Sequence, residues 1–269
     1  MLMRSMNSIC SITPTISLLL GIEAPAASQA SALEQVAGAA RSPGPSGLGR
    51  CLIFSPDAIG TALVRKYGSL FLPVRRHAPV EVGLRSVMPP KTPVCYASMF
   101  TGAPPAVHGI TEYVKRPPAC ETVFDVLARE GRAAAIVAVK ASSMDTIFRP
   151  SGVDHFTESD DEKVLVRTNA LIKADRHQII VSYQQRYDDI LHREHPESRE
   201  AMEAVRRHVS DFASLAAAVR SAWDKHRYLI TFSPDHGAHY DPAAGTGDHG
   251  DDIPEDMQVT HFFGFGRPT

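Results

Sequence analysis

The chain has 269 residues, of which 43% are hydrophobic, and a formal net charge of −2. This length and apolar content suit one substantial core, so we expect one main domain. The near-neutral charge excludes the large basic field that binds a nucleic-acid backbone, so no nucleic-acid partner is expected. No apolar run approaches the roughly 20 residues of a transmembrane helix, so no membrane span is predicted.

Two interpretations compete for residues 1–30. A positively charged start, an apolar run over 9–20 and small residues over 24–30 are typical of an export signal. Pro14 interrupts the apolar run, however, and Glu23 follows it closely. We therefore expect this segment to belong to the folded protein.

The four cysteines show neither a zinc-binding spacing nor the density of a disulfide framework. A reducing compartment, the cytoplasm, is the expected location, with export as the alternative if residues 1–30 are a signal peptide. Pro and Gly gather over 39–49 and predict a linker. The chain is therefore divided into an N-terminal helical segment with its linker, residues 1–50, packed on the core, and a main domain, residues 51–269.

Beyond residue 50, short β-rich runs alternate with helical ones, which is the pattern of parallel strands joined by crossover helices. Apolar residues recur at steps of three and four over 198–223 and predict a long amphipathic helix. A second helix is expected over 121–130, where Gly131 ends it. We predict an α/β fold with a mostly parallel sheet, helices on both faces, and no large cap domain. The expected strands are 52–54, 134–139, 179–183 and 229–232.

Acidic and His residues follow several of these strands. In open α/β sheets, ligands bind beyond the carboxyl ends of the strands. Each residue alone has a structural explanation, Asp57 as a helix cap and His236 as a packing histidine. Their shared placement instead predicts two metal sites, and mixed carboxylate and imidazole ligands suit Zn²⁺, with Mn²⁺ or Fe as alternatives. The candidate ligands are Asp57, Asp188, His192, Asp235, His236 and His249, the last in a Gly-rich stretch that can reach back.

A second motif starts at Lys91-Thr92-Pro93 and continues through Thr101-Gly102 and Pro105 to His108-Gly109-Ile110. It resembles the alkaline phosphatase superfamily, above all its nucleotide pyrophosphatase/phosphodiesterase and phosphonoacetate hydrolase branches. Those enzymes place a nucleophilic Thr ahead of a Thr-Gly, a Pro and a His-Gly-Ile. The resemblance extends over most of residues 51–266.

The resemblance implies a hydrolase acting on phosphoric ester or phosphoanhydride bonds of a small phosphorylated substrate. Thr92 would attack phosphorus and form a phosphothreonine that is then hydrolysed, with two divalent metal ions assisting. The oligomeric state stays open. The implied ligands are Asp57, Thr92, Asp235 and His236 for one ion, and Asp188, His192 and His249 for the other.

The chain departs from these branches directly after His-Gly-Ile. Enzymes of these branches carry an Asn at this point that helps hold a phosphoryl oxygen. This chain has Thr111-Glu112-Tyr113 instead. Tyr113 and Lys91 are candidates for that role. Lys140, after the strand at 134–139, resembles a carboxylate-binding Lys of phosphonoacetate hydrolases, although a solvated Lys is the commoner case.

Other functions compete with the phosphodiesterase type. A phosphonate hydrolase or a phosphomutase of the same superfamily is an alternative, but a phosphomutase normally carries a larger second domain. A sulfatase is disfavoured because Thr92 cannot replace its oxidised Cys or Ser, and Tyr96 stands where its Arg would be. A metal-stabilised binding protein would need closed sites, whereas a free Thr92 hydroxyl favours an open one.

The run over 12–23 offers one more comparison. Related enzymes often carry a similar Pro-Thr-Ile and Leu-Leu-Gly-Ile run after their last metal His, so the order in this chain resembles a circular permutation. We expect a short helix near the strand region 262–265, with Ile16, Leu19 and Leu20 pointing inward.

Overall fold

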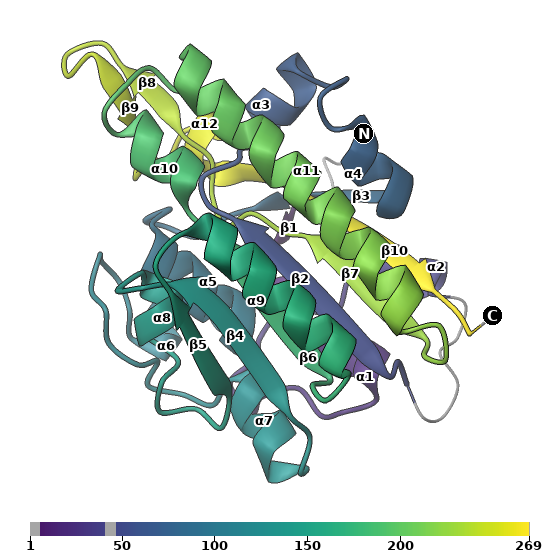
Figure 1. Cartoon of the computed structure of the whole chain (residues 1–269). Helices are drawn as coiled ribbons and strands as arrows, with labels where there is room; N and C mark the ends of the chain where they lie inside the picture. Colours follow the sequence, from purple (N-terminus) through teal and green to yellow (C-terminus); the bar gives the residue numbers. More distant parts are fainter. Residues whose placement is uncertain (1–5, 41–46, 269) are drawn as a thin grey trace, which may run out of the picture.

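The structure, a computed structural model, describes residues 6–40 and 47–268. Part of the predicted linker, residues 41–46, lies outside them. The described residues form an eight-stranded mixed sheet with helices on both faces, and a separate two-stranded hairpin (Figure 1). The predicted α/β fold with a mostly parallel sheet is confirmed.

The central sheet has the strand order β1-β3-β10-β7-β2-β6-β4-β5. Strands β7, β2, β6, β4 and β5 are parallel neighbours, whereas β10 runs antiparallel to both β3 and β7. The strands are β1 (Asn7–Ser8), β2 (Arg50–Pro56), β3 (Val80–Arg85), β4 (Ala134–Val139), β5 (Asp154–Glu158), β6 (Ile179–Gln184), β7 (Tyr228–Phe232) and β10 (Gln258–Gly266). The separate hairpin pairs β8 (His239–Asp241) with β9 (Thr246–Asp248). All four predicted strands are therefore present within the parallel set.

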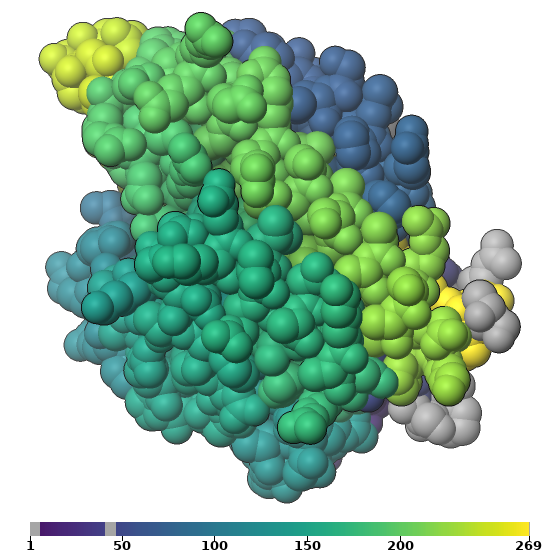
Figure 2. Space-filling model, viewed as in Figure 1, coloured from purple at the N-terminus to yellow at the C-terminus, as the bar shows by residue number. Residues whose placement is uncertain are grey.

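Two hydrophobic clusters cover the two faces of the sheet. Successive side chains of a strand point to opposite faces, and in β2 Cys51 and Ile53 join one cluster while Leu52 and Phe54 join the other. Figure 1 shows α9 and α11 side by side across the second face, and the space-filling view in Figure 2 shows them covering it. The sheet is thus buried on both sides, as the apolar runs of its parallel strands require.

The helices that cover the sheet are short apart from α9 and α11. Among the described residues, no helix is both long and apolar enough to cross a membrane. The helices are α1 (Ile12–Leu20), preceded by a 3₁₀ turn (Ile9–Ser11), α2 (Glu34–Ala39), α3 (Thr61–Lys66), α4 (Leu72–His77), α5 (Thr92–Thr101), α6 (Pro105–His108), α7 (Val123–Arg129), α8 (Ser143–Thr146), α9 (Asp161–Ala174), α10 (Arg186–Leu191), α11 (Arg199–Ala222) and α12 (Pro254–Met257).

The two predicted helices are present, with ends set by capping side chains. Ser198 caps α11 by accepting a hydrogen bond from the Ala201 amide at 3.1 Å. The other predicted helix, α7, begins two residues later than expected because Thr122 and Asp125 form a capping box before Val123. A capping residue has non-helical backbone angles, so the helix starts after it.

Residues 9–20 form part of the hydrophobic core. Ile16, Leu19 and Leu20 are each 1% exposed and share a cluster with Phe263, so the expected inward face of this helix is confirmed. Its nearest helical neighbours are α2 and α5, and Thr13 Oγ1 donates a hydrogen bond to the Met99 carbonyl of α5 at 2.6 Å. The N-terminal segment therefore supports the helix that starts at Thr92.

Gly102 shows how closely this segment approaches α5. It ends the helix with a left-handed conformation (φ 70°), and a Cβ placed there would lie 2.2 Å from Ser28 Oγ. The Gln29 amide also donates to the Gly102 carbonyl at 3.0 Å. Both the backbone angle and the contact demand glycine at this motif position.

Candidate metal centre

The candidate ligands gather where three parallel strands end. Strands β7, β2 and β6 are neighbours in the sheet, so the segments that follow them start at the same edge. Asp57 follows β2, and Asp235 and His236 follow β7. Asp188 lies in α10, directly after β6.

Asp57, Asp235 and His236 form the first cluster, and all three are buried. The His236 Nε2 atom lies 3.4 Å from Asp57 Oδ1 and 3.3 Å from Asp235 Oδ2. Asp57 is not a helix cap, because the residue that caps α3 is Gly60. Asp57 therefore lacks the helix-capping role that would explain it structurally.

Thr92 lies beside this cluster at the first position of α5. Its Oγ1 atom is 3.4 Å from Asp57 Oδ2 and 3.4 Å from His236 Nε2. The side chain is only 4% exposed. The hydroxyl thus faces the same small space as the carboxylate and imidazole atoms.

Asp188, His192 and His249 form the second cluster. Asp188 Oδ1 lies 3.4 Å from the Nε2 atom of each histidine, and the two Nε2 atoms are 3.1 Å apart. Ligand atoms about 2.0–2.1 Å from a tetrahedral Zn²⁺ lie roughly 3.3 Å from one another. The spacing in this cluster therefore matches one shared ion, and the same spacing recurs in the first cluster.

The histidines are oriented so that their Nε2 atoms face the clusters. His249 Nδ1 lies 2.8 Å from the Pro90 carbonyl, and His236 Nδ1 lies 3.0 Å from the Gly237 carbonyl. A carbonyl on Nδ1 selects the tautomer whose Nε2 is free to bind a metal. The His236 and His249 ring centroids are 4.0 Å apart, so the two clusters adjoin.

The donor set fits divalent cations. Asp57 Oδ1, Asp188 Oδ1 and Asp235 Oδ2 are buried and have no hydrogen-bond partner among the described residues. Such oxygens are costly to bury unless a proton or a cation satisfies them. The three carboxylates and three imidazoles could therefore hold two ions, with Thr92 completing the first set.

The pKa values of these groups reflect burial and the charges of their close neighbours. Burial, followed by the nearby Asp188 charge, raises the pKa of Asp57 to about 7, and burial with Asp57 raises the pKa of Asp235 strongly. Burial also acts to raise the pKa of Asp188, but the nearby imidazoles of His192 and His249 lower it overall. The pKa of His249 rises to about 9 because Asp188 outweighs the opposing effect of burial. A bound cation would take the place of the protons that the cluster otherwise needs.

Two supporting residues escaped the sequence analysis. The Tyr183 hydroxyl donates to Asp57 Oδ2. The Ser86 hydroxyl donates to the Asp235 carbonyl at 2.8 Å. The position of Tyr183 near the end of β6 is a signal for a role at this edge of the sheet. Its partner Asp57 follows another strand, so the sequence did not indicate the contact. Nothing in the sequence near Ser86 indicated its role.

A cavity of about 340 Å³ opens onto the second cluster, and Tyr113 at its mouth is 53% exposed. Lys140 is exposed at the end of β4 and does not line this cavity, so the structure separates it from the other candidates. The lining residues are Lys91, Thr92, Tyr113, Asp188, Asp189, His192, Asp248 and His249.

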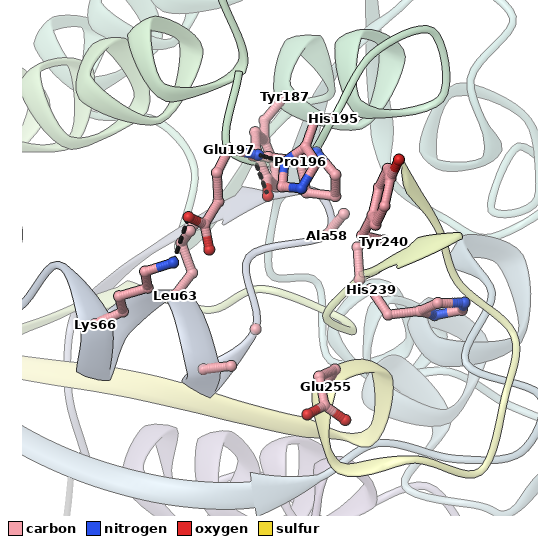
Figure 3. A pocket seen from close by; sticks show the side chains of 13 residues that line it. Ala58, Leu63, Lys66, Tyr187, His195, Pro196, Glu197, His239, Tyr240 and Glu255 are labelled. Carbon is pink, nitrogen blue, oxygen red and sulfur yellow. Dashed lines mark hydrogen bonds and ion pairs between the residues drawn. The ribbon is translucent and has the colours of Figure 1, made fainter. Parts of the chain in front are cut away.

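A second cavity, of about 360 Å³, lies between α3, the segment after α10 and the β8 strand (Figure 3). The rings of His195 and Tyr240, which both line it, are tilted against each other with centroids 4.4 Å apart, and Glu197 pairs with Lys66. None of the candidate ligands lines this cavity.

Solved structures share the fold at low sequence identity. The phosphonoacetate hydrolase of Sinorhizobium meliloti 1021, in complex with phosphonoformate, is 18% identical with a TM-score of 0.56, over 74% of this chain and 59% of that chain. Murine ectonucleotide pyrophosphatase/phosphodiesterase 5, in complex with AMP, is 16% identical with a TM-score of 0.56, over 71% of this chain and 58% of that chain. A putative sulfatase from Bacteroides thetaiotaomicron is 14% identical with a TM-score of 0.56, over 80% of this chain and 64% of that chain. The chain thus spans less than two thirds of the length of each.

No curated protein matches the chain. The family model described as type I phosphodiesterase/nucleotide pyrophosphatase matches residues 74–258, which is more than half of the chain. This range contains Thr92 and all the candidate ligands except Asp57. The chain therefore belongs to the type I phosphodiesterase/nucleotide pyrophosphatase family of the alkaline phosphatase superfamily.

Proposed function

We propose that the protein is a metal-dependent hydrolase of phosphoric diesters or phosphoanhydrides, with Thr92 as its nucleophile. The observation that carries this proposal is the position of the Thr92 hydroxyl. It lies 3.4 Å from both Asp57 and His236 of the first cluster, and it lines the same cavity as His249 of the second. A closed structural site would leave no hydroxyl in this position.

Two divalent ions held by the clusters would supply Lewis acidity toward the phosphoryl group and toward the attacking and leaving oxygens. The chain itself supplies the nucleophile: Thr92 Oγ1 gives up its proton and forms a bond to phosphorus as the bond to the leaving oxygen breaks, and the leaving oxygen takes up a proton. A water oxygen then bonds to phosphorus as the bond to Thr92 Oγ1 breaks, and one proton of that water restores the Thr92 hydroxyl. Thr92 also begins α5, whose positive helix end favours a phosphoryl anion at this point.

The residues at the mouth of the cavity would contact the rest of the substrate. Lys91 precedes Thr92 and is the lysine of the lining, while Tyr113 offers a hydroxyl and an exposed ring. We assign these two residues to substrate binding. Lys140 receives no such role, because it is exposed and outside the lining.

The ligand chemistry also bears on the metal. Three carboxylates and three imidazoles, with donor atoms 3.1–3.4 Å apart, suit Zn²⁺ in particular, and Mn²⁺ or Fe could be held by the same residues. We propose Zn²⁺. Elemental analysis of the purified protein tests this assignment, and full activity of metal-free protein in chelator would contradict the metal-dependent mechanism.

The nucleophile is tested by replacing Thr92 with Ala and with Ser. The Ala variant should stay folded and lose hydrolysis of chromogenic phosphate esters, whereas the Ser variant should keep part of it because a hydroxyl is retained. Near-normal turnover of Thr92→Ala would instead favour direct attack by water. The panel should compare phosphate monoesters and diesters with Zn²⁺ and with Mn²⁺, and include phosphonoacetate to test the phosphonate alternative.

We also propose a cytoplasmic location. Cys10, Cys51 and Cys95 are buried free thiols, and Cys120 is partly exposed, which suits a reducing compartment. The N-terminal sequence of the purified native protein tests this: a start near Ala27 would show that the segment is a processed leader and the protein is exported.

A further inference from the structure

Asp256 in α12 is a fully buried carboxylate outside the two clusters. One carboxylate oxygen, Oδ1, lies 2.8 Å from His239 Nδ1. The other oxygen, Oδ2, accepts hydrogen bonds from the Gly250 amide at 2.9 Å and the Asp251 amide at 3.0 Å. The side chain therefore joins the first residue of β8 to the loop that follows β9.

The two amides held by Asp256 come directly after His249. Backbone amides bound by one carboxylate oxygen hold the chain in a single local conformation. Gly250 adopts φ 138°, which side-chain-bearing residues rarely adopt, so this loop is an unusual turn that needs support. The other anchor of His249 is its own Nδ1 atom on the Pro90 carbonyl. His249 is thus fixed from two sides, by Pro90 and through the next two amides by Asp256.

The backbone of Asp256 makes a related contact. Its carbonyl accepts a hydrogen bond from the Gly237 amide at 2.8 Å, directly after His236 of the first cluster. This contact does not depend on the side chain. Truncating the Asp256 side chain should therefore release the loop after His249 while leaving the segment after His236 in place.

We propose that Asp256 is a positioning residue that holds His249 in the geometry needed to bind the second metal ion. The inference rests on the proposed two-metal function. Groups that orient metal-binding histidines typically change metal affinity about 10–100-fold when they are removed. Asp256 would act through the backbone after His249, without contacting the ion.

Zinc binding by the full chain tests the inference without using activity. Zn²⁺ stoichiometry and affinity are measured by competition with a chromogenic chelator, for wild type, Asp256→Ala and the control Glu255→Ala. Glu255 is the adjacent acidic residue, but its side chain is exposed at the second cavity (Figure 3) and makes no hydrogen bond among the described residues. We expect Asp256→Ala to bind one Zn²⁺ normally and the second about 10–100-fold more weakly, and Glu255→Ala to bind both normally.

A second pair of variants keeps the test decisive if Asp256→Ala does not fold. Asp256→Asn retains an oxygen that can accept from both amides, and His239→Ala leaves the Oδ2 contacts intact, so both should bind the second Zn²⁺ close to wild-type affinity. If Asp256→Ala and wild type bind the second ion with equal affinity, the inference about Asp256 is overturned and the proposed function is not. Loss of the second ion in Asp256→Asn or His239→Ala would also overturn it. A wild-type protein that binds no Zn²⁺, Mn²⁺ or Fe would overturn both this inference and the proposed function.

Discussion

Leu18 and Leu19 are neighbours in α1 with opposite surroundings, and they give a direct test of the role of the N-terminal helix. Leu19 is 1% exposed in the core, whereas Leu18 is 54% exposed. Replacing a buried Leu with Ala removes its transfer free energy and leaves a cavity, at a cost of about 2–5 kcal/mol. An exposed Leu far from such packing should cost less than about 0.5 kcal/mol.

The difference in thermal stability between the Leu19→Ala and Leu18→Ala variants should be easy to measure. For a chain of this size, about 1 kcal/mol corresponds to roughly 2–4 °C in Tm, so Leu19→Ala should lower the Tm by roughly 4–20 °C. Leu18→Ala should leave it within about 2 °C. The single tryptophan, Trp223, is fully buried in the cluster on the opposite face of the sheet, so its fluorescence reports unfolding of the whole domain.

Urea titration of both variants, followed by Trp223 fluorescence and by circular dichroism, completes the test. Coincident transitions would show that α1 and the far face of the sheet unfold together. Equal stability of the Leu18 and Leu19 variants would refute the reasoning, because the segment would then not be a part of the core on which the rest depends.

Two further predictions concern pH and glycine. Burial lowers the pKa of His208 and of His261 to about 4, below the value of about 6.5 in an unfolded chain. The unfolded state therefore binds protons first, and the free energy of unfolding should fall as pH drops from about 6.5 toward 4, by a few kcal/mol per histidine. Urea titrations at pH 7 and at pH 5 measure this loss of stability, and His208→Gln should make it smaller. Gly102 and Gly131 both have left-handed φ values, 70° and 69°, but only Gly102 has neighbours within 4 Å of an added Cβ. Gly131→Ala should cost about 1–2 kcal/mol and Gly102→Ala clearly more; equal Tm values would contradict the close packing of Ser28 on α5.

The sequence alone determined the elements whose signals are local. Strand β4 was predicted with its bounds over 134–139, and the stripe of α11 was read from residues three and four apart. Both patterns reflect short-range geometry, alternation along a strand and the helical repeat. The order of Asp and His residues after strands also predicted which side chains to consider as ligands, because parallel strands end at one edge of the sheet.

Tertiary structure decided what depends on partners distant in the chain. Tyr183 reaches Asp57 from a different strand, Asp256 holds the loop after His249, and Lys140 does not line the cavity. The antiparallel position of β10, between β3 and β7, was likewise not predicted. No local pattern encodes these pairings, since hydrogen-bond partners and neighbouring strands are selected by how the whole core packs. The spacing of 3.1–3.4 Å between the candidate ligands arises in the same way, because the ends of three strands and the loop after β9 meet in one folded chain.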